Sequence, residues 1–103
     1  MSSQPQLDRR LAERLGRRLR ELREGIDMSQ EQVAHAAGLN RNHYQLLESG
    51  LSDRAKNTPA NPRLSTLVAL CRVYGTTVPD LAIDLFGAPP GHPVIEVDLP
   101  PHP

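Results

Sequence analysis

The sequence predicts an all-α fold, a compact bundle of five helices followed by an extended, proline-rich tail. Apolar residues recur at spacings of three and four along most of the chain, which is the period of a helix with one buried face. Glycine or asparagine stands at the ends of several of these stretches, where helices are commonly capped or stopped. An apolar content of 38%, with only three aromatic residues among 103, also suits a small helical core better than a β-sandwich.

The first helix is expected at about residues 7–24, after a flexible N-terminus at residues 1–6. Gly25 is expected to end it. Seven arginines surround its apolar stripe, and we interpret them mainly as a solvated face. The stripe consists of Leu7, Leu11, Leu15, Leu19, Leu22 and Ile26.

Two short helices are expected next, at about 30–37 and 41–48. Ser29 with a glutamine three positions later is typical of a capping box, so the first short helix begins directly after Ser29. Gly38 is expected to close that helix, and Asn40 can cap the second.

Residues 51–63 are expected to form a loop, because they hold two prolines, two asparagines and a Ser-Asp pair. This loop is long for a compact helical domain, and long loops are often functional. It carries three basic residues, which are Arg54, Lys56 and Arg63.

Two further helices are expected at about 64–74 and 78–86, each with one apolar face. The tail follows at 87–103, and its residues 94–99 alternate apolar and acidic side chains as a strand would. We therefore expect a helical domain at 7–86 and a separate tail. The two apolar faces consist of Leu64, Leu67, Val68, Cys71 and Tyr74, and of Val78, Leu81, Ala82, Leu85 and Phe86.

The formal net charge is zero, but the charges are distributed unevenly. Residues 1–63 contain eleven Lys and Arg against eight Asp and Glu, whereas residues 64–103 contain one against four. Such asymmetry indicates a charged partner for the first part of the chain.

Several functional classes find no support in the sequence. The single Cys71 permits no internal disulfide and no apolar run reaches the length of a membrane span, so we expect a cytoplasmic protein without a membrane partner. The four histidines have no ligand partners at suitable spacing, so neither a metal nor a cofactor is expected. Asp80 and Asp84 lack a nearby nucleophile, histidine or phosphate-binding loop, so no catalytic residue and no enzyme are expected.

The two short helices carry a pattern of spacings that specifies a helix-turn-helix. Counted from Gln30, the fifth residue is the small Ala34, which lets a second helix cross closely. The ninth residue is Gly38, which allows the positive φ that a tight turn requires. Apolar residues stand at five positions that such a pair buries, which are Val33, Ala37, Leu39, Tyr44 and Leu47.

Residues 15–86 resemble the Cro and phage-repressor type of helix-turn-helix domain, the XRE family of bacterial and phage transcription regulators. Two stretches carry the resemblance: LGRRLRELREGIDMSQEQVAHAAGLNRNHYQLLESG and NPRLSTLVALCRVYG. The resemblance implies a compact, lambda-repressor-like domain of five helices whose partner is double-stranded DNA. It also implies a bacterial or phage regulator that acts in the cytoplasm, in association with the nucleoid.

The resemblance places the helix at 41–48 in the major groove, with its first turn at the base edges. The side chains available there for base contacts are those of Asn40, Arg41, Asn42, His43 and, one turn further on, Gln45. Arginine can bond two acceptors of guanine, and asparagine can pair similarly with adenine. Leu46 stands where the family often has a polar or basic reader, so we expect it to meet a thymine methyl group or the neighbouring loop.

Contacts with the DNA backbone are expected from Ser29, Gln30, Arg54, Lys56 and Arg63. Ser29 and Gln30 lie at the start of a helix, where free N–H groups and the helix dipole favour a phosphate. The resemblance assigns Gln30 this role and also supports Arg63. Arg54 and Lys56 belong to an insertion that the usual family connection lacks.

Glu48 is expected to form an ion pair, because an unpaired anion at a helix C-terminus opposes the helix dipole. The resemblance points to Arg23 as its partner. The pair would be structural and would tie the first helix to the third.

We expect a two-fold dimer, because one recognition helix reaches only a few base pairs and two half-sites about one helical turn apart are read together. The expected dimer surface is formed by Leu81, Leu85 and Phe86. Two alternatives stay open: an antitoxin that binds operator DNA and also a toxin protein through the tail, and a protein-interaction domain without DNA binding. Co-purification with a toxin would identify the first, and failure to bind random duplex at low salt would identify the second.

Overall fold

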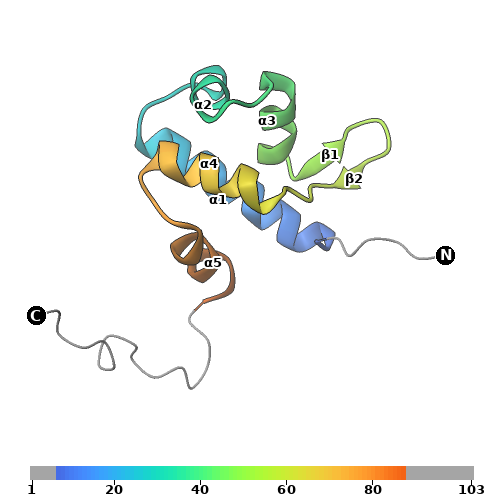
Figure 1. Ribbon diagram of the computed structural model, residues 1–103. Helices are drawn as coiled ribbons and strands as arrows, with labels where there is room; N and C mark the ends of the chain where they lie inside the picture. The colour runs from blue at the N-terminus through green and yellow to red at the C-terminus, as the bar shows by residue number, and fades with distance from the viewer. Residues whose placement is uncertain (1–6, 88–103) are drawn as a thin grey trace, which may run out of the picture.

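The structure, a computed structural model, describes residues 7–87. The N-terminal segment 1–6 and the tail segment 88–103, with the strand expected at 94–99, lie outside the described residues. The described part is mostly helical and contains the five predicted helices (Figure 1). The helices are α1 (Arg9–Gly25), α2 (Gln30–Ala37), α3 (Arg41–Glu48), α4 (Leu64–Tyr74) and α5 (Val78–Phe86). No helix within residues 7–87 is long and apolar enough to cross a membrane.

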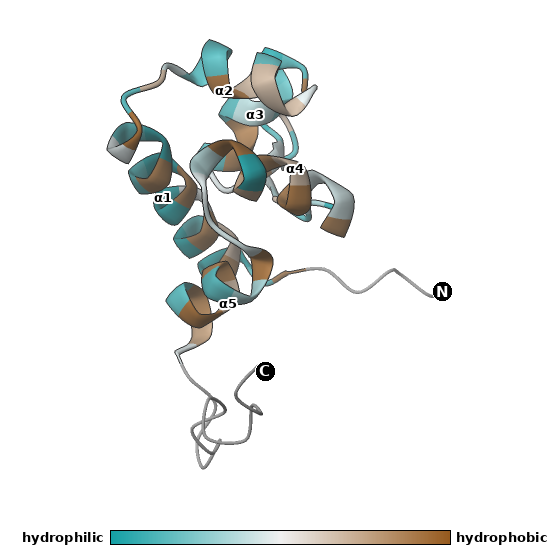
Figure 2. Cartoon of the chain, turned by 60° about the vertical axis from the view of Figure 1, so that its left-hand side comes forward, coloured by the Kyte–Doolittle hydropathy of each residue, from teal (hydrophilic) through white to brown (hydrophobic). Residues whose placement is uncertain are grey.

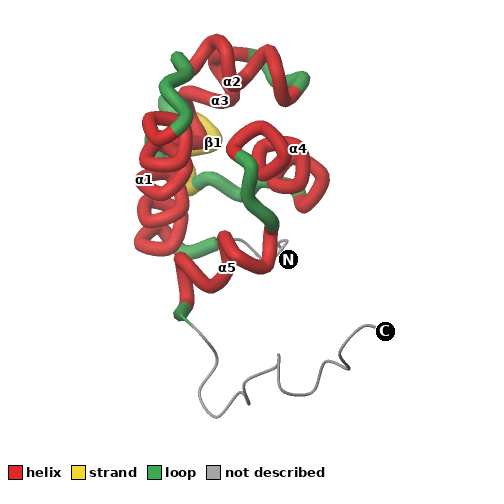
Figure 3. Tube along the Cα trace, turned by 90° about the vertical axis from the view of Figure 1, so that its left-hand side faces the viewer, coloured by secondary structure: helices red, strands yellow, loops and turns green. Residues whose placement is uncertain are grey.

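The helices are arranged around α1, the longest of them. α3 packs against α1, α2 packs against α3 and α4, and α5 contacts both α1 and α4. α2 and α3 therefore form one end of the domain and α5 the other, with α1 and α4 between them (Figure 3). This arrangement leaves one side of the α2–α3 pair free at the surface of the domain.

The first helix begins two residues later than predicted and ends at Gly25. The Asp8 carboxylate accepts a hydrogen bond from the N–H of Leu11 at 2.7 Å, so Asp8 caps the helix and α1 begins at Arg9. Gly25 is the last residue of α1, as expected, and Ile26 caps the helix. The chain turns afterwards at Asp27, whose φ of 60° is one of the left-handed conformations that aspartate tolerates. The bounds predicted for the other four helices are confirmed.

The segment predicted as a plain loop at 51–63 contains a β-hairpin. Strands β1 (Leu51–Asp53) and β2 (Thr58–Pro59) are antiparallel, and the chain reverses through Asn57, whose φ is 54°. Strands of three and two residues are too short to show the alternation by which a strand is detected in a sequence. The hairpin lies beside α3 and extends from the α2–α3 end of the domain (Figure 1).

The core is formed by the apolar faces of all five helices and by Ala60, which follows the hairpin. Figure 2 shows hydrophobic and hydrophilic segments alternating along α1, as expected for a helix with one buried face. The buried residues are Ala12, Leu15, Leu19, Val33, Ala34, Tyr44, Leu47, Ala60, Leu70, Cys71, Tyr74, Leu81 and Leu85.

Two residues of the predicted apolar faces are exposed. Leu64, the first residue of α4, and Phe86, the last residue of α5, each have 66% of their surface exposed. The exposure of Phe86 leaves it available for the dimer surface expected from the sequence. Leu81 and Leu85, in contrast, are buried inside the domain. They cannot supply the dimer surface that was expected from the sequence.

Gly16 sets the distance between α1 and α3, a role that the sequence pattern does not reveal. A Cβ atom placed on Gly16 would lie 2.5 Å from the carbonyl oxygen of Glu48 and 2.7 Å from that of Leu47. The last turn of α3 therefore rests directly on the α1 backbone. Only glycine permits this approach, so Gly16 helps to fix the position of α3 on the domain.

Candidate nucleic-acid interface

The turn between α2 and α3 has the geometry that its spacing predicts. Gly38 adopts φ 74° and ψ 28°, in the left-handed region, and the N–H of Leu39 donates to the carbonyl of Ala34 at 2.8 Å. Ala34 is buried beneath this turn. At the other end of α2 the Ser29 hydroxyl accepts from the N–H of Gln32 at 3.1 Å, and the Gln32 side chain accepts from the N–H of Ser29 at 2.8 Å. Both ends of α2 are thus capped.

The first turn of α3 presents three side chains that the described part of the protein does not use. Arg41, Asn42 and His43 are exposed, and their side chains make no hydrogen bond or ion pair within residues 7–87. Asn40 differs from them, because its side-chain oxygen caps α3 by accepting from the N–H groups of Asn42 and His43 at 2.7 and 3.2 Å. Asn40 therefore has only its amide donors left for another partner.

A polar network connects α1, α2 and α3 behind this surface. Glu48 accepts from Arg23, with 2.6 Å between Nε and Oε2, and from the Gln30 amide at 2.8 Å. The Gln45 amide in turn donates to the side-chain oxygen of Gln30 at 3.3 Å. Arg23 also donates to the carbonyl of Met28 at 2.9 Å. Gln30 and Gln45, both expected to touch DNA, therefore have side chains that are hydrogen-bonded to other residues of the domain.

Burial and hydrogen bonding change the pKa values of Glu48 and Tyr44. Burial by itself would raise the pKa of Glu48, but hydrogen bonds from Arg23, Tyr44 and Gln30 outweigh it and lower the pKa below its ordinary value. Burial, together with the hydrogen bond to Glu48, raises the pKa of Tyr44 far above its ordinary value. The hydroxyls of Tyr44 and Tyr74 lie 2.6 Å apart in the core, which extends the network to α4.

The lowered pKa of Glu48 predicts acid sensitivity of the fold. A group whose pKa is lower in the folded state stabilises that state above its unfolded pKa, here near 4.5, and the contribution disappears as the pH falls through the folded pKa. We expect the urea midpoint of unfolding to fall as the pH is lowered from neutrality to below 4.5. Glu48→Gln should flatten this acid-dependent loss, whereas Glu21→Gln, which changes an exposed carboxylate, should not. If the urea midpoint of Glu48→Gln depends on pH as steeply as that of the wild type, Glu48 is not the source of the acid sensitivity.

The β1–β2 hairpin displays basic residues beside α3. Arg54 and Lys56 are exposed in its turn, and the N–H of Lys56 donates to the Asp53 carboxylate at 3.2 Å. The hairpin is anchored by Arg9, which donates to the carbonyl of Asn57 at 2.7 Å. Arg63, also exposed, is the residue before α4 and makes no side-chain cap. The sequence indicated these basic residues but not the strands that hold Arg54 and Lys56.

Two further observations concern the chemistry of the site. Leu46 is half-buried, whereas Arg41 and Asn42 are exposed. Among residues 7–87 no group of three or more His, Cys, Asp or Glu side chains is arranged to hold a metal ion.

Comparison with known proteins identifies similar domains. A model of the helix-turn-helix domain family matches residues 14–83 of the chain. The chain is 31% identical over 67 residues to the cryptic phage CTXphi transcriptional repressor RstR of Vibrio cholerae, a match that covers 65% of the chain and 53% of the repressor. The chain therefore spans about half the length of that repressor. The fold is similar to the crystal structure of the clp gene regulator ClgR from C. glutamicum, with a TM-score of 0.63 and 24% identity over 82% of this chain and 96% of that one.

Proposed function

Because the chain belongs to the helix-turn-helix domain family, we propose that it is a sequence-specific DNA-binding transcriptional regulator and not an enzyme. One observation carries the proposal. The first turn of α3 presents Arg41, Asn42 and His43 to solvent, while the helix behind them is held on α1 and α2. The similarity to a transcriptional repressor and the fold of a gene regulator support the same function. Such a protein acts in the cytoplasm, where its DNA lies.

In this proposal α3 enters the major groove and its exposed first turn reads bases. Arg41 bonds two acceptors of a guanine, Asn42 pairs with an adenine, and His43 serves as a third contact. Asn40 contributes only through its amide donors, because its oxygen caps α3. Gln45 has a supporting role, since it is half-buried and bonded to Gln30.

We infer that phosphates lie at the N-terminus of α2 and along the hairpin. The Ser29 hydroxyl and the Gln30 side chain have partners inside the domain, so main-chain N–H groups at the start of α2 supply the contact there. Arg54 and Lys56 supply positive charge beside α3, and Arg63 adds a further exposed charge before α4. The recognition helix is thereby flanked by two backbone contacts that fix its depth and register in the groove.

The central test is selection of binding sites from randomised duplexes, followed by affinity measurements on the selected site. Arg41→Ala should weaken binding roughly 5- to 150-fold, which corresponds to about 1–3 kcal/mol for one bidentate base contact, and should relax the preference at one base pair. Arg72→Ala, which removes an exposed arginine of α4, is the matched control and should leave affinity and preference unchanged. No enriched sequence, or equal effects of the two variants, would contradict the proposal.

The same selection tests a two-fold dimer. A dimer should select two related half-sites whose centres lie about one helical turn, roughly 10 base pairs, apart. Leu81 and Leu85 are buried in the core, so the dimer that we propose uses the outer face of α5 at the exposed Ile83. A selected site without an internal repeat would indicate binding by a single protomer.

The hairpin makes a separate prediction about salt dependence. Each phosphate contact contributes a slope of about −0.9 to the plot of log affinity against log salt concentration. Replacing Arg54 and Lys56 together by alanine should therefore make this slope shallower by up to about 1.8 and weaken binding to all sequences alike. Titrations of a selected and a random duplex at several salt concentrations measure both effects. An unchanged slope would show that the hairpin does not reach the backbone.

A further inference from the structure

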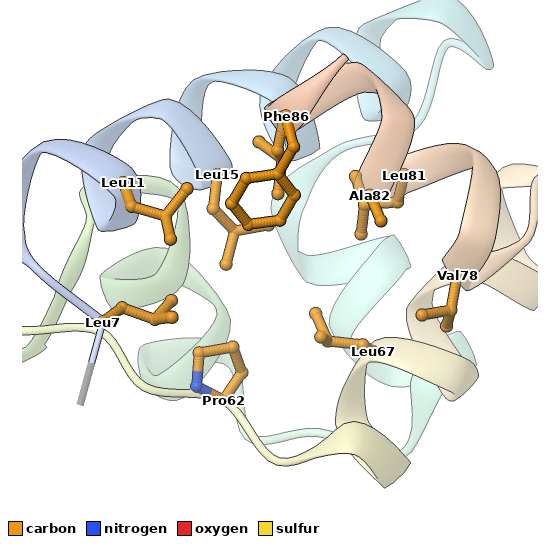
Figure 4. Close-up of a pocket in the computed structure, with 10 residues that line it drawn as sticks. Leu7, Leu11, Leu15, Pro62, Leu67, Val78, Leu81, Ala82 and Phe86 are labelled. Carbon is orange, nitrogen blue, oxygen red and sulfur yellow. The ribbon is translucent and has the colours of Figure 1, made fainter. Parts of the chain in front are cut away.

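An apolar cavity opens at the end of the domain opposite α2 and α3. Its volume is about 160 Å³, and it lies between the start of α1, the segment before α4, and α5 (Figure 4). Its lining is apolar throughout and includes Leu7, Leu11, Pro62, Leu67, Val78 and Phe86. The cavity is partly open to solvent, and Phe86, one of its lining residues, is largely exposed.

The size and chemistry of the cavity restrict what can fill it. An apolar cavity of about 150 Å³ is large enough for a benzene-sized group, so this one can accept one or two aliphatic side chains. Its lining offers no charged group to a ligand within the cavity. The occupant must therefore supply apolar side chains, and burying them would remove exposed hydrocarbon, including that of Phe86, from water.

The charges beside the cavity indicate an acidic neighbour. Arg14 of α1 donates a hydrogen bond to the carbonyl of Leu85, which places it at the C-terminal turn of α5. Arg10 lies one turn earlier on the same face of α1 and has no ion pair within the described part of the chain. An occupant with apolar side chains on one side and carboxylates on the other would fill the cavity and also place negative charge beside these arginines.

The chain itself contains such a segment a short distance further along. The sequence of residues 94–99 is Val-Ile-Glu-Val-Asp-Leu. In an extended conformation Ile95, Val97 and Leu99 share one side, and Glu96 and Asp98 share the other. The apolar side matches the cavity, and the acidic side matches Arg10 and Arg14.

The connection between cavity and segment is short enough for one chain to supply both. α5 has nine residues and is therefore about 14 Å long. The eight residues that follow Gly87, up to Ile95, can span up to about 26 Å, so the segment can return along α5 to the cavity. A short tether of this kind gives an effective concentration in the millimolar range, which favours the segment of the same chain over that of a second copy at micromolar protein.

We propose that residues 94–99 dock into this cavity of their own domain. Ile95 and Val97 fill the space between Leu11, Leu67 and Val78, and Glu96 faces Arg10. The tail thereby becomes part of the domain surface and covers the apolar face beside α5. This inference does not depend on DNA binding, since the cavity lies at the other end of the domain from α3.

Nuclear Overhauser effects in the full chain, between methyl groups of the tail and of the cavity, test the proposal. Wild type should show contacts from Ile95 or Val97 to Leu11, Leu67 or Val78. Val97→Asp should abolish them and shift the cavity methyl resonances. Val94→Asp is the matched control: it makes the same change on the opposite side of the extended segment and should leave the contacts in place. Neither variant alters the described core, so both should fold.

Three results would overturn the proposal. The first is an absence of tail-to-cavity contacts in wild type. The second is an equal loss of contacts in Val97→Asp and Val94→Asp. The third comes from a mixture of two differently labelled samples: contacts between labelled and unlabelled chains would show that the segment enters the cavity of a second copy.

Discussion

Replacing Arg23 by alanine should lower the free energy of unfolding by about 3–5 kcal/mol, because it leaves a buried carboxylate without its cation. Only 4% of the Glu48 side chain and 13% of the Arg23 side chain are exposed to solvent. Gln30 and Tyr44 would still donate to Glu48, but neither carries a positive charge. Arg23 also holds the carbonyl of Met28 in the turn before α2, so the substitution removes a second contact as well.

Urea unfolding at neutral pH measures this loss, and an unchanged m-value would show that the effect is on stability alone. Arg20→Ala is the matched control in the same helix. Arg20 forms an ion pair with Glu24 in which both side chains are largely exposed, and an exposed pair at this spacing contributes only about 0.3–0.5 kcal/mol. If the two variants lose similar stability, the Arg23–Glu48 pair has no special role in holding α3 on α1.

Gly16→Ala should also be strongly destabilising, although alanine is normally the better residue inside a helix. The added methyl group would lie under 3 Å from the backbone at Leu47 and Glu48, which is closer than unbonded atoms can approach. Relief requires α1 and α3 to separate, and overpacking of this kind costs about 1–3 kcal/mol or more. In the same helix, Gly25→Ala meets nothing within 4 Å and should stabilise the protein by up to about 1 kcal/mol.

Thermal unfolding of the two glycine variants compares them directly. For a domain of this size a change of 1 kcal/mol moves the midpoint by roughly 4–8 °C, so the two midpoints should move in opposite directions by amounts that are easily separated. DNA affinity measured on folded Gly16→Ala should fall too, because α3 would no longer sit at its native height on α1. A midpoint for Gly16→Ala at or above that of wild type would show that the helices separate without cost.

The sequence predicts the helices well because each has a periodic apolar face and most have a recognisable cap. Ser29 and Asn40 act as caps where they were expected, and the Arg23–Glu48 pair expected from the family resemblance is present. The hairpin was missed because its strands are too short for a pattern. Gly16 was missed because a glycine inside a helix gives no sign of what lies against it until α3 is placed.

The sequence predicted which residues form the candidate site, but not the role of each residue. Asn40, Arg41, Asn42 and His43 are adjacent polar residues, and the sequence assigned Asn40 both a cap and a base contact without showing that the cap occupies its side-chain oxygen. The structure separates them through hydrogen bonds, since Asn40 closes the helix end. Likewise, only the packing of α2 against α3 shows that Gln45 bonds to Gln30.

The side chains of Arg41, Asn42 and His43 make no hydrogen bond or ion pair within residues 7–87. This affects how freely these three positions can change between related proteins. Surface substitutions that break no cap, contact or hydrogen bond usually change stability by less than about 0.5 kcal/mol. These three positions can therefore be exchanged for other polar side chains while the domain keeps its stability. In the base-reading role that we propose for these residues, copies of such a gene acquire separate operators within a few substitutions. A library randomised at these three codons should then consist mostly of folded proteins that differ in the DNA they recognise.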